Sequence, residues 1–153
     1  MATPAAFSSP GGTQPDSIQG DASRLRILVV DDSESIRQLI EQKLHDLARD
    51  GRLTTPVVEL ACDGEQAVAM NQEAPYDLVF LDVEMPGMGG REACRHLKSA
   101  GVPRVAMLSS RTSASDHQAG HEAGCDNYLC KPPADADLRV ILRLAALKKR
   151  TSG

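Results

Sequence analysis

Short apolar runs alternate with amphipathic stretches along the chain from about residue 24 onward. Apolar runs of this kind, bounded by turn-forming residues, are typical of strands that are buried on both faces of a sheet. The pattern predicts strands at Arg26–Asp31, Pro56–Ala61, Asp77–Asp82, Arg104–Ser109 and Asn127–Cys130.

The stretches between these runs place apolar residues at a helical period. They predict helices at Ser33–Arg49, Gly64–Glu73, Gly90–Ser99, Ser115–Ala123 and Ala134–Lys149. Asp32 or Ser33 is suited to cap the first helix. The first helix is expected to bury Ile36, Leu39, Ile40, Leu44 and Leu47, and the last helix Leu138, Ile141, Leu142 and Ala145.

Strict alternation of strands and helices predicts an α/β protein with a doubly wound, five-stranded parallel sheet and helices on both faces. The flavodoxin-like strand order 2-1-3-4-5 fits this alternation and puts a switch point between the first and third strands. Residues 1–23 are rich in Ala, Ser, Thr, Pro and Gly, so we expect a disordered tail there. One folded domain then covers residues 24–150.

Charge and composition limit the partners of this domain. A net charge of -4 disfavours binding to a phosphate backbone, and an aromatic content of 3% offers little surface for stacking on bases. No apolar run approaches the roughly 20 residues of a membrane span, and no signal peptide is visible. We therefore expect no nucleic-acid partner, no membrane association and a cytoplasmic location.

Cysteines and histidines are candidate metal ligands in any chain. The four cysteines are Cys62, Cys94, Cys125 and Cys130. They include no Cys-x-x-Cys pair, which favours reduced thiols over a disulfide framework or a zinc site. His117 and His121 have a metal-ligand spacing, but no third ligand is evident nearby, so we expect both to be exposed.

Acidic side chains end two of the predicted strands. Asp31 and Asp32 follow the first apolar run, and Asp82 closes the third. Because the carboxyl ends of parallel strands share one edge of a sheet, these three side chains should converge. Converging carboxylates repel one another unless a cation joins them, and Mg²⁺ prefers such oxygen ligands. The pattern therefore predicts a magnesium site.

Further polar groups complete an ordered set at the same edge. The set is Asp31-Asp32, Asp82, Ser109, Tyr128 and Lys131-Pro132. Over residues 25 to 149 the chain resembles the receiver domain of two-component response regulators. The local matches include Val29-Val-Asp-Asp-Ser33, Asp63-Gly64, Leu81-Asp-Val-Glu-Met-Pro-Gly87 and Gly124-Cys-Asp-Asn-Tyr-Leu-Cys-Lys-Pro132.

The resemblance implies that Asp82 accepts a phosphoryl group from a phosphohistidine on a sensor histidine kinase or a histidine phosphotransfer protein. It implies that Asp32 and Asp82 bind Mg²⁺ directly, that Asp31 binds it through water, and that the backbone carbonyl of Glu84 is a further ligand. Lys131 and Ser109 would each contact a phosphoryl oxygen. The Lys131–Pro132 peptide bond would be cis.

The resemblance also implies a conformational switch. Ser109 would move toward the phosphoryl group, and Tyr128 would rotate inward into the space that it leaves. This would change the surface formed by Ser115–Ala123, Asn127–Cys130 and Ala134–Lys149. The expected molecule is a stand-alone switch and not a conventional enzyme. It would bind a downstream target protein or relay the phosphoryl group onward, and the sequence leaves both open.

Two features at variable positions were also noted. Glu84 and Arg111 flank the expected site, and we hypothesise that they form an ion pair over it. The polar connection between Asp50 and Thr55 is a few residues longer than is typical of such domains, and the sequence assigns it no function.

Other functional classes fit less well. A flavin-binding protein needs a Ser/Thr/Gly-rich phosphate loop after the first strand, where this chain has Asp-Asp-Ser-Glu. Phosphatases of the haloacid dehalogenase type carry an Asp-x-Asp motif after the first strand, whereas here the two acids are adjacent. A degenerate receiver that acts only as a scaffold would not need the acids, the hydroxyl and the lysine that are all present.

Overall fold

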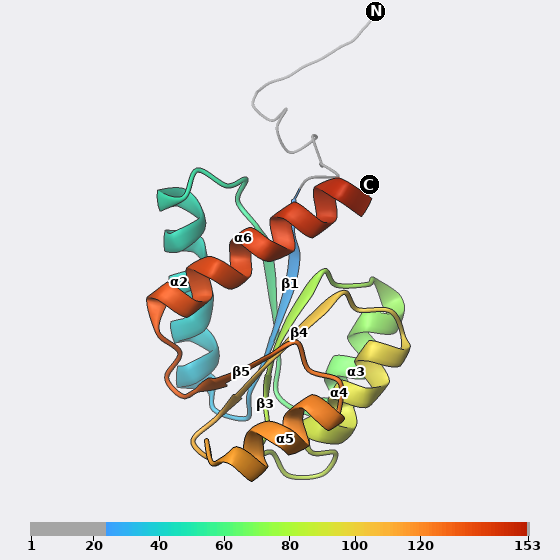
Figure 1. The fold of residues 1–153 in the computed structure, drawn as a ribbon. Coiled ribbons are helices and arrows are strands. Elements are labelled where there is room, and N and C mark those ends of the chain that lie inside the picture. The colour runs from blue at the N-terminus through green and yellow to red at the C-terminus, as the bar shows by residue number, and fades with distance from the viewer. Residues whose placement is uncertain (1–23, 153) are drawn as a thin grey trace, which may run out of the picture.

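The five apolar runs form one parallel sheet in the computed structural model, which describes residues 24–152 (Figure 1). The strands are β1 (Arg26–Val30), β2 (Val57–Ala61), β3 (Leu78–Asp82), β4 (Arg104–Ser109) and β5 (Asn127–Cys130). The helices are α2 (Glu34–Asp50), α3 (Gly64–Glu73), α4 (Gly90–Ser99), α5 (Ala114–Glu122) and α6 (Asp135–Ser152). The tail expected over residues 1–23 lies outside the described part.

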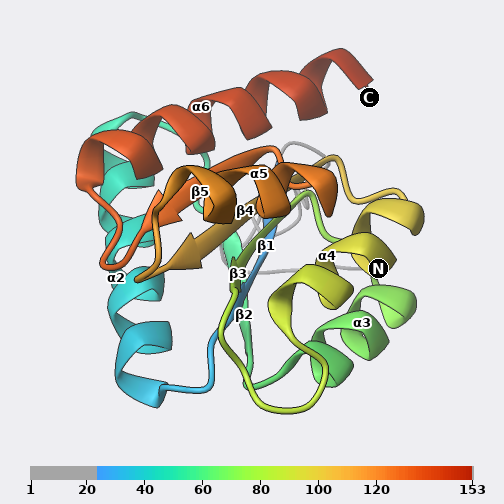
Figure 2. The same ribbon diagram turned by 60° about the horizontal axis from the view of Figure 1, so that its bottom comes forward.

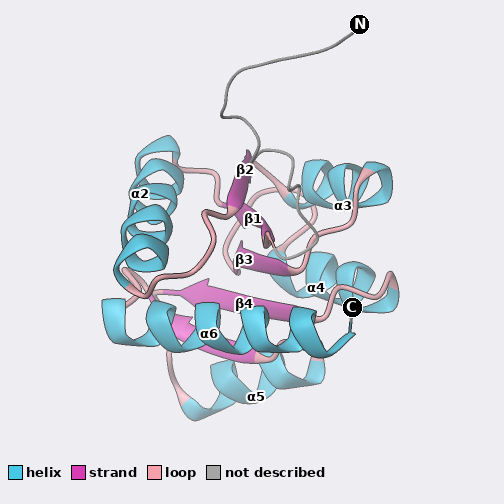
Figure 3. Cartoon of the chain, turned by 90° about the horizontal axis from the view of Figure 1, so that it is seen from above, coloured by secondary structure: helices cyan, strands magenta, loops and turns pink. Residues whose placement is uncertain are grey.

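Helices cover both faces of the sheet, because alternate strand residues point to opposite sides (Figure 3). In β1, Ile27 and Val29 pack with the apolar residues of α2 and α6. Leu28 and Val30 pack on the other side, with residues of α3 and α4. These strand residues are fully buried, which explains why the first strand reads as a continuous apolar run.

The strand order β2-β1-β3-β4-β5 confirms the predicted topology. β1 lies between β2 and β3, with Val30 in register with both Ala61 and Leu81. The chain reverses its direction of winding between β1 and β3, so the loops that follow these two strands lead to helices on opposite faces of the sheet, α2 on one and α4 on the other. The crevice between these loops is where open α/β sheets place their ligands.

The predicted helix faces are confirmed with one exception. The side chain of Ser33, and not that of Asp32, caps α2 by accepting from the backbone N–H of Ile36. Leu39 is 42% exposed, so its predicted burial was wrong. One helical step of about 100° separates Leu39 from Ile40, and Ile40 lies at the centre of the buried stripe.

The start of α4 lies very close to the end of β3. A Cβ atom added at Gly90 would come within 2.6 Å of the Cα atom of Val83, so only glycine fits there without a backbone shift. The Gly90 N–H donates to the carbonyl oxygen of Val83 at 3.1 Å. This contact holds the loop that follows Asp82.

None of the helices within residues 24–152 combines the length and the apolar character that crossing a bilayer requires.

Candidate functional site

Three carboxylates meet at the C-terminal edge of the sheet, which Figure 2 brings forward. One oxygen from each of Asp31, Asp32 and Asp82 lies within 4.8 Å of the other two. Asp31 and Asp82 are buried, whereas Asp32 is exposed. The structure therefore brings together the acids that the sequence placed at the ends of two separate strands.

A lysine from the loop after β5 lies between the two buried acids. Lys131 Nζ donates to Asp82 Oδ1 at 3.1 Å and to Asp31 Oδ2 at 3.3 Å. Its backbone N–H donates to the carbonyl oxygen of Ser109 at 2.9 Å, which fixes this loop against the end of β4. The Lys131–Pro132 peptide bond is cis, as the family resemblance implied.

Burial and charge perturb the ionisation of this cluster. Burial raises the pKa of Asp82 from 3.8 to about 6, and the negative charge of Asp31 adds to the increase. The hydrogen bond from Lys131 and the backbone N–H of Glu84 oppose it. Burial lowers the pKa of Lys131, but its bonds to Asp82 and Asp31 outweigh that effect, and the net change is upward.

The oxygens of the three acids differ in how far the protein already satisfies them. Asp31 Oδ1 accepts from the Ser33 N–H at 2.9 Å and Asp31 Oδ2 accepts from Lys131. Asp82 Oδ2 is buried and has no hydrogen-bond partner among the described residues. An unpartnered buried carboxylate oxygen is costly unless another group binds it. Together with the exposed carboxylate of Asp32, it fits a small divalent cation such as Mg²⁺.

The rim of the site differs from the expectation. Glu84 Oε2 accepts a hydrogen bond from the hydroxyl of Ser109 at 2.6 Å. No ion pair joins Glu84 to Arg111 in residues 24–152, so that hypothesis was wrong for this conformation. Arg111 instead contributes its backbone, since its N–H donates to Ser109 Oγ at 2.9 Å.

The aromatic residue of β5 is held by three contacts. Tyr128 is buried, and its hydroxyl donates to the carbonyl oxygen of Arg111 at 2.8 Å. The ring of His117 lies against it with 4.7 Å between the centroids. The ring also covers Gly120, where an added Cβ atom would lie 2.6 Å from Tyr128 Cδ2. Tyr128 therefore occupies a buried position in this structure.

Sequence reasoning missed two of these contacts and misjudged a third. His117 was expected to be exposed but is only half-exposed, because it packs on Tyr128. The one sequence signal at Gly120 is that a glycine lies within a predicted helix. Such a glycine often marks a position where another group packs closely against the helix. The pairing of Glu84 with Ser109 depends on how two loops from different strands approach each other.

The cysteines behave as predicted. All four are free; Cys94 and Cys125 are buried, and Cys62 and Cys130 are exposed. Cys62 is exposed because it follows the end of β2 at the sheet edge.

A comparison with known proteins identifies the family of this fold. The family described as "Response regulator receiver domain" matches residues 27–143. The chain belongs to the response regulator receiver family. Solved receivers also resemble it: the chemotaxis protein CheY4 of Vibrio cholerae covers 80% of this chain with a TM-score of 0.69 and 32% identity, and the match spans 98% of that protein. The receiver domain of the Francisella response regulator 1452 covers 82%, with a TM-score of 0.70, 25% identity and 98% of its own length matched.

Curated relatives are longer than this receiver. The transcriptional regulatory protein ResD of Bacillus subtilis (strain 168) is 36% identical over 83% of this chain and 49% of its own length. The response regulator MprA of Mycobacterium sp. (strain KMS) is 40% identical over 84% of this chain and 52% of its own length. The chain thus spans about half the length of these relatives.

Proposed function

We propose that this receiver, over residues 24–150, accepts a phosphoryl group on Asp82 from a phosphohistidine of a sensor histidine kinase or a histidine phosphotransfer protein. The observation that carries the proposal is the buried carboxylate of Asp82, whose Oδ2 has no hydrogen-bond partner among the described residues. The ammonium group of Lys131 and the carboxylates of Asp31 and Asp32 lie close to it.

The proposed step is a transfer of one phosphoryl group between two nucleophiles. The bond between phosphorus and the imidazole nitrogen of the donor breaks, and a bond between phosphorus and a carboxylate oxygen of Asp82 forms. The product is a mixed anhydride, and the imidazole leaves with the electron pair of the broken bond. Such transfers depend mainly on positioning and on neutralising the charge of the phosphoryl oxygens.

Mg²⁺ fits the acidic side of the site. Asp32 and Asp82 are proposed as direct ligands, with the backbone carbonyl of Glu84. Asp31 is proposed to act through a water molecule, which agrees with both of its oxygens already accepting protein hydrogen bonds. The bound cation would neutralise charge on the acids and on the phosphoryl oxygens.

Lys131 and Ser109 are proposed to bind the phosphoryl oxygens. Lys131 already donates to Asp82 Oδ1 and carries a compact positive charge on a flexible stem. The hydroxyl of Ser109 would leave the carboxylate of Glu84 and donate to the phosphoryl group instead. Glu84 therefore competes with the phosphoryl group for this hydroxyl. Arg111 is proposed to act at the same rim, through its backbone contact with Ser109.

Tyr128 is proposed as the second switch residue. Its hydroxyl donates a hydrogen bond to the carbonyl oxygen of Arg111, and the backbone N–H of Arg111 donates to Ser109 Oγ. Movement of Ser109 would shift the balance between conformations of the Tyr128 ring, and with it the surface of α5, β5 and α6. Val140 and Leu144 are exposed apolar residues of α6. They provide an apolar contact surface for output by binding a downstream target protein, or for docking a phosphotransfer partner in a relay.

The proposal is tested by incubating the protein with acetyl phosphate and Mg²⁺ and reading its intact mass. The wild type should gain one phosphoryl group, Asp82→Asn should gain none, and omission of Mg²⁺ should abolish the gain. Asp77→Asn is the matched control, because Asp77 lies at the opposite end of β3 and should leave labelling intact. Equal labelling of wild type and Asp82→Asn would refute the assignment.

The class of activity is tested separately. A switch holds its phosphoryl group and turns over slowly, whereas phosphatases release phosphate with rates on the order of 1–10³ per second. Such a rate with small phosphate esters would show that the site belongs to an enzyme instead.

A further inference from the structure

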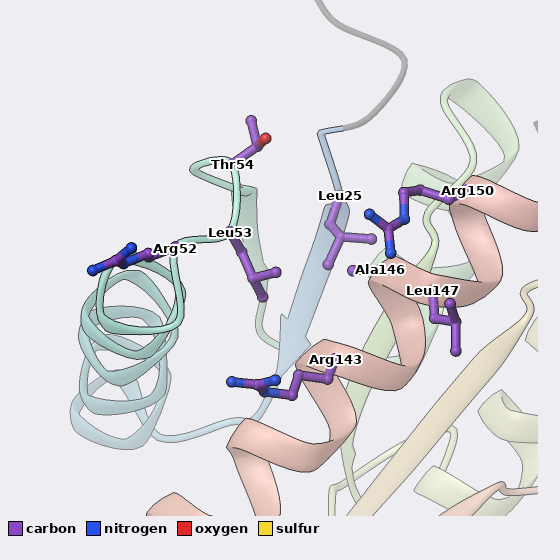
Figure 4. A pocket seen from close by; sticks show the side chains of 8 residues that line it. All are labelled: Leu25, Arg52, Leu53, Thr54, Arg143, Ala146, Leu147 and Arg150. Carbon is purple, nitrogen blue, oxygen red and sulfur yellow. The ribbon is translucent and has the colours of Figure 1, made fainter.

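A cavity lies at the opposite end of the sheet from the acidic site. It has a volume of about 450 Å³ and is lined by Leu25, Arg52, Leu53, Thr54, Arg143, Ala146, Leu147 and Arg150 (Figure 4). The lining comes from the residue before β1, the connection after α2 and the C-terminal half of α6. The size lies within the range of small-molecule sites.

The charge of this cavity is opposite to that of the whole chain. Three of the lining residues are arginines and none is acidic, although the chain carries a net charge of -4. Within residues 24–152, the structure gives none of these three guanidinium groups an ion-pair partner, whereas neighbouring Arg49 pairs with Asp46 and Asp50, and Lys149 pairs with Asp77. Among the described residues, positive charge is thus concentrated here without an acidic side chain paired to it.

The arrangement of α6 gives the cavity two charged ends and an apolar floor. Arg143 and Arg150 are seven residues apart, which separates their backbones by about 10 Å along one face of the helix. Figure 4 shows both guanidinium groups reaching from α6 toward the side of the cavity formed by Leu25 and Leu53. Ala146 and Leu147 lie between the two arginines on the same face, and Leu147 is 52% exposed.

The long connection after α2 builds the opposite wall. Arg52 has a φ of 59°, a left-handed conformation that is rare for a residue other than glycine. The next residue turns back, so that the Leu53 N–H donates to the carbonyl oxygen of Ala48 at 2.8 Å and the Leu53 side chain enters the cavity. This unusual backbone conformation gives the extra loop length a structural role.

We propose that this cavity binds an organic anion in which a phosphate or carboxylate group is joined to an apolar body. The planar guanidinium groups of Arg143 and Arg150 hold the anionic group, which such groups can contact through two parallel hydrogen bonds. The apolar body lies against the side chains of Leu25, Leu53 and Leu147, which also line the cavity. This site is independent of phosphoryl transfer at Asp82.

The test titrates the full chain with n-octyl phosphate below its micellar concentration, by isothermal titration calorimetry in EDTA. Inorganic phosphate supplies the charge alone, octyl glucoside the alkyl chain alone, and AMP the same phosphate on a nucleoside. Octyl phosphate, AMP or both should bind at one site per chain. Each that binds should do so at least about tenfold more tightly than inorganic phosphate or octyl glucoside. The one that binds identifies an alkyl or a nucleoside body. Failure of both to exceed inorganic phosphate and octyl glucoside would overturn the proposal.

Substitutions then locate the binding. Arg143→Gln and Arg150→Gln should each weaken it about tenfold, as expected for loss of a charge-assisted hydrogen bond. Arg139→Gln is the control, because it removes the same charge from an exposed position of α6 outside the cavity. Leu147→Ser should weaken binding of the organic phosphate but not of inorganic phosphate. Equal weakening by Arg139→Gln would show general charge attraction and refute the site.

Discussion

Replacing the candidate phosphoacceptor should stabilise the protein when Mg²⁺ is absent. Burial raises the pKa of Asp82 to about 6 from an ordinary value of 3.8, so the folded state resists its ionisation. Between these two pKa values the folded protein binds more protons than the unfolded chain, and its stability therefore falls as the pH rises. Asp82→Asn keeps a neutral side chain of nearly the same shape and removes this penalty.

The magnitude follows from the shift. At about 1.4 kcal/mol per unit, the ionised Asp82 costs about 3 kcal/mol of folding free energy at pH 7 and less than about 1 kcal/mol at pH 4. For a domain of this size, the Asp82→Asn midpoint of thermal unfolding should lie on the order of 10 °C above that of the wild type at pH 7. Added Mg²⁺ should reduce this difference between the two unfolding midpoints, because it stabilises only the wild type.

Urea denaturation in EDTA at pH 4, 5.5 and 7 measures the effect. Asp137→Asn is the control, since Asp137 is exposed on the first turn of α6, and it should change the unfolding free energy by no more than about 0.5 kcal/mol. The reasoning is refuted if wild type and Asp82→Asn are equally stable at pH 7. It is also refuted if the difference between them stays constant down to pH 4.

Three further substitutions or titrations check other parts of the structure. Gly90→Ala should destabilise the fold by about 2 kcal/mol or more in urea denaturation, because its Cβ atom would meet backbone atoms. At Gly89 an added Cβ atom would make only an ordinary contact, 3.9 Å from the carbonyl oxygen of Val83, so Gly89→Ala should cost about 1 kcal/mol or less, and equal costs would contradict the close approach at Gly90. Ser113→Ala removes a capping box at the start of α5 and should cost about 1 kcal/mol, so an unchanged unfolding free energy would argue against the cap. Burial and a carboxylate partner raise the pKa of Tyr76 to about 12. In a Tyr128→Phe variant Tyr76 is the remaining tyrosine, so ultraviolet absorbance should show little phenolate below pH 11, and half-ionisation near pH 10 would be inconsistent with this environment.

Much of the fold could be predicted because its signals are local. Ile27 through Val30 form an unbroken apolar run, and such a run at this length fits a strand covered on both faces. Alternation of these strands with helices then leaves few topologies, since crossovers between parallel strands are right-handed. The wrong expectation for Leu39 arose because a helical period alone does not say where the centre of the buried stripe lies.

The acids of the site were predictable for the same reason. Asp31, Asp32 and Asp82 each follow the last apolar residue of a strand, and the topology places those strand ends next to each other. The rim was not predictable in this way. Whether the carboxylate of Glu84 meets the hydroxyl of Ser109 or the guanidinium of Arg111 depends on the paths of two loops and on side-chain rotamers, which no residue pattern encodes.

Periodicity and chain connectivity fix the strand order, the faces of most helices and the clustering of three acids at one sheet edge, so these features can be read from the order of the residues. Packing between elements buries Tyr128 against His117 and Gly120, and sets Arg143 and Arg150 opposite Leu25 and Leu53 across a cavity. The residues in these contacts are far apart along the chain, or the directions of their side chains depend on the rotamer that each adopts. Their contacts arise from packing between elements, and packing is a property of the folded chain as a whole.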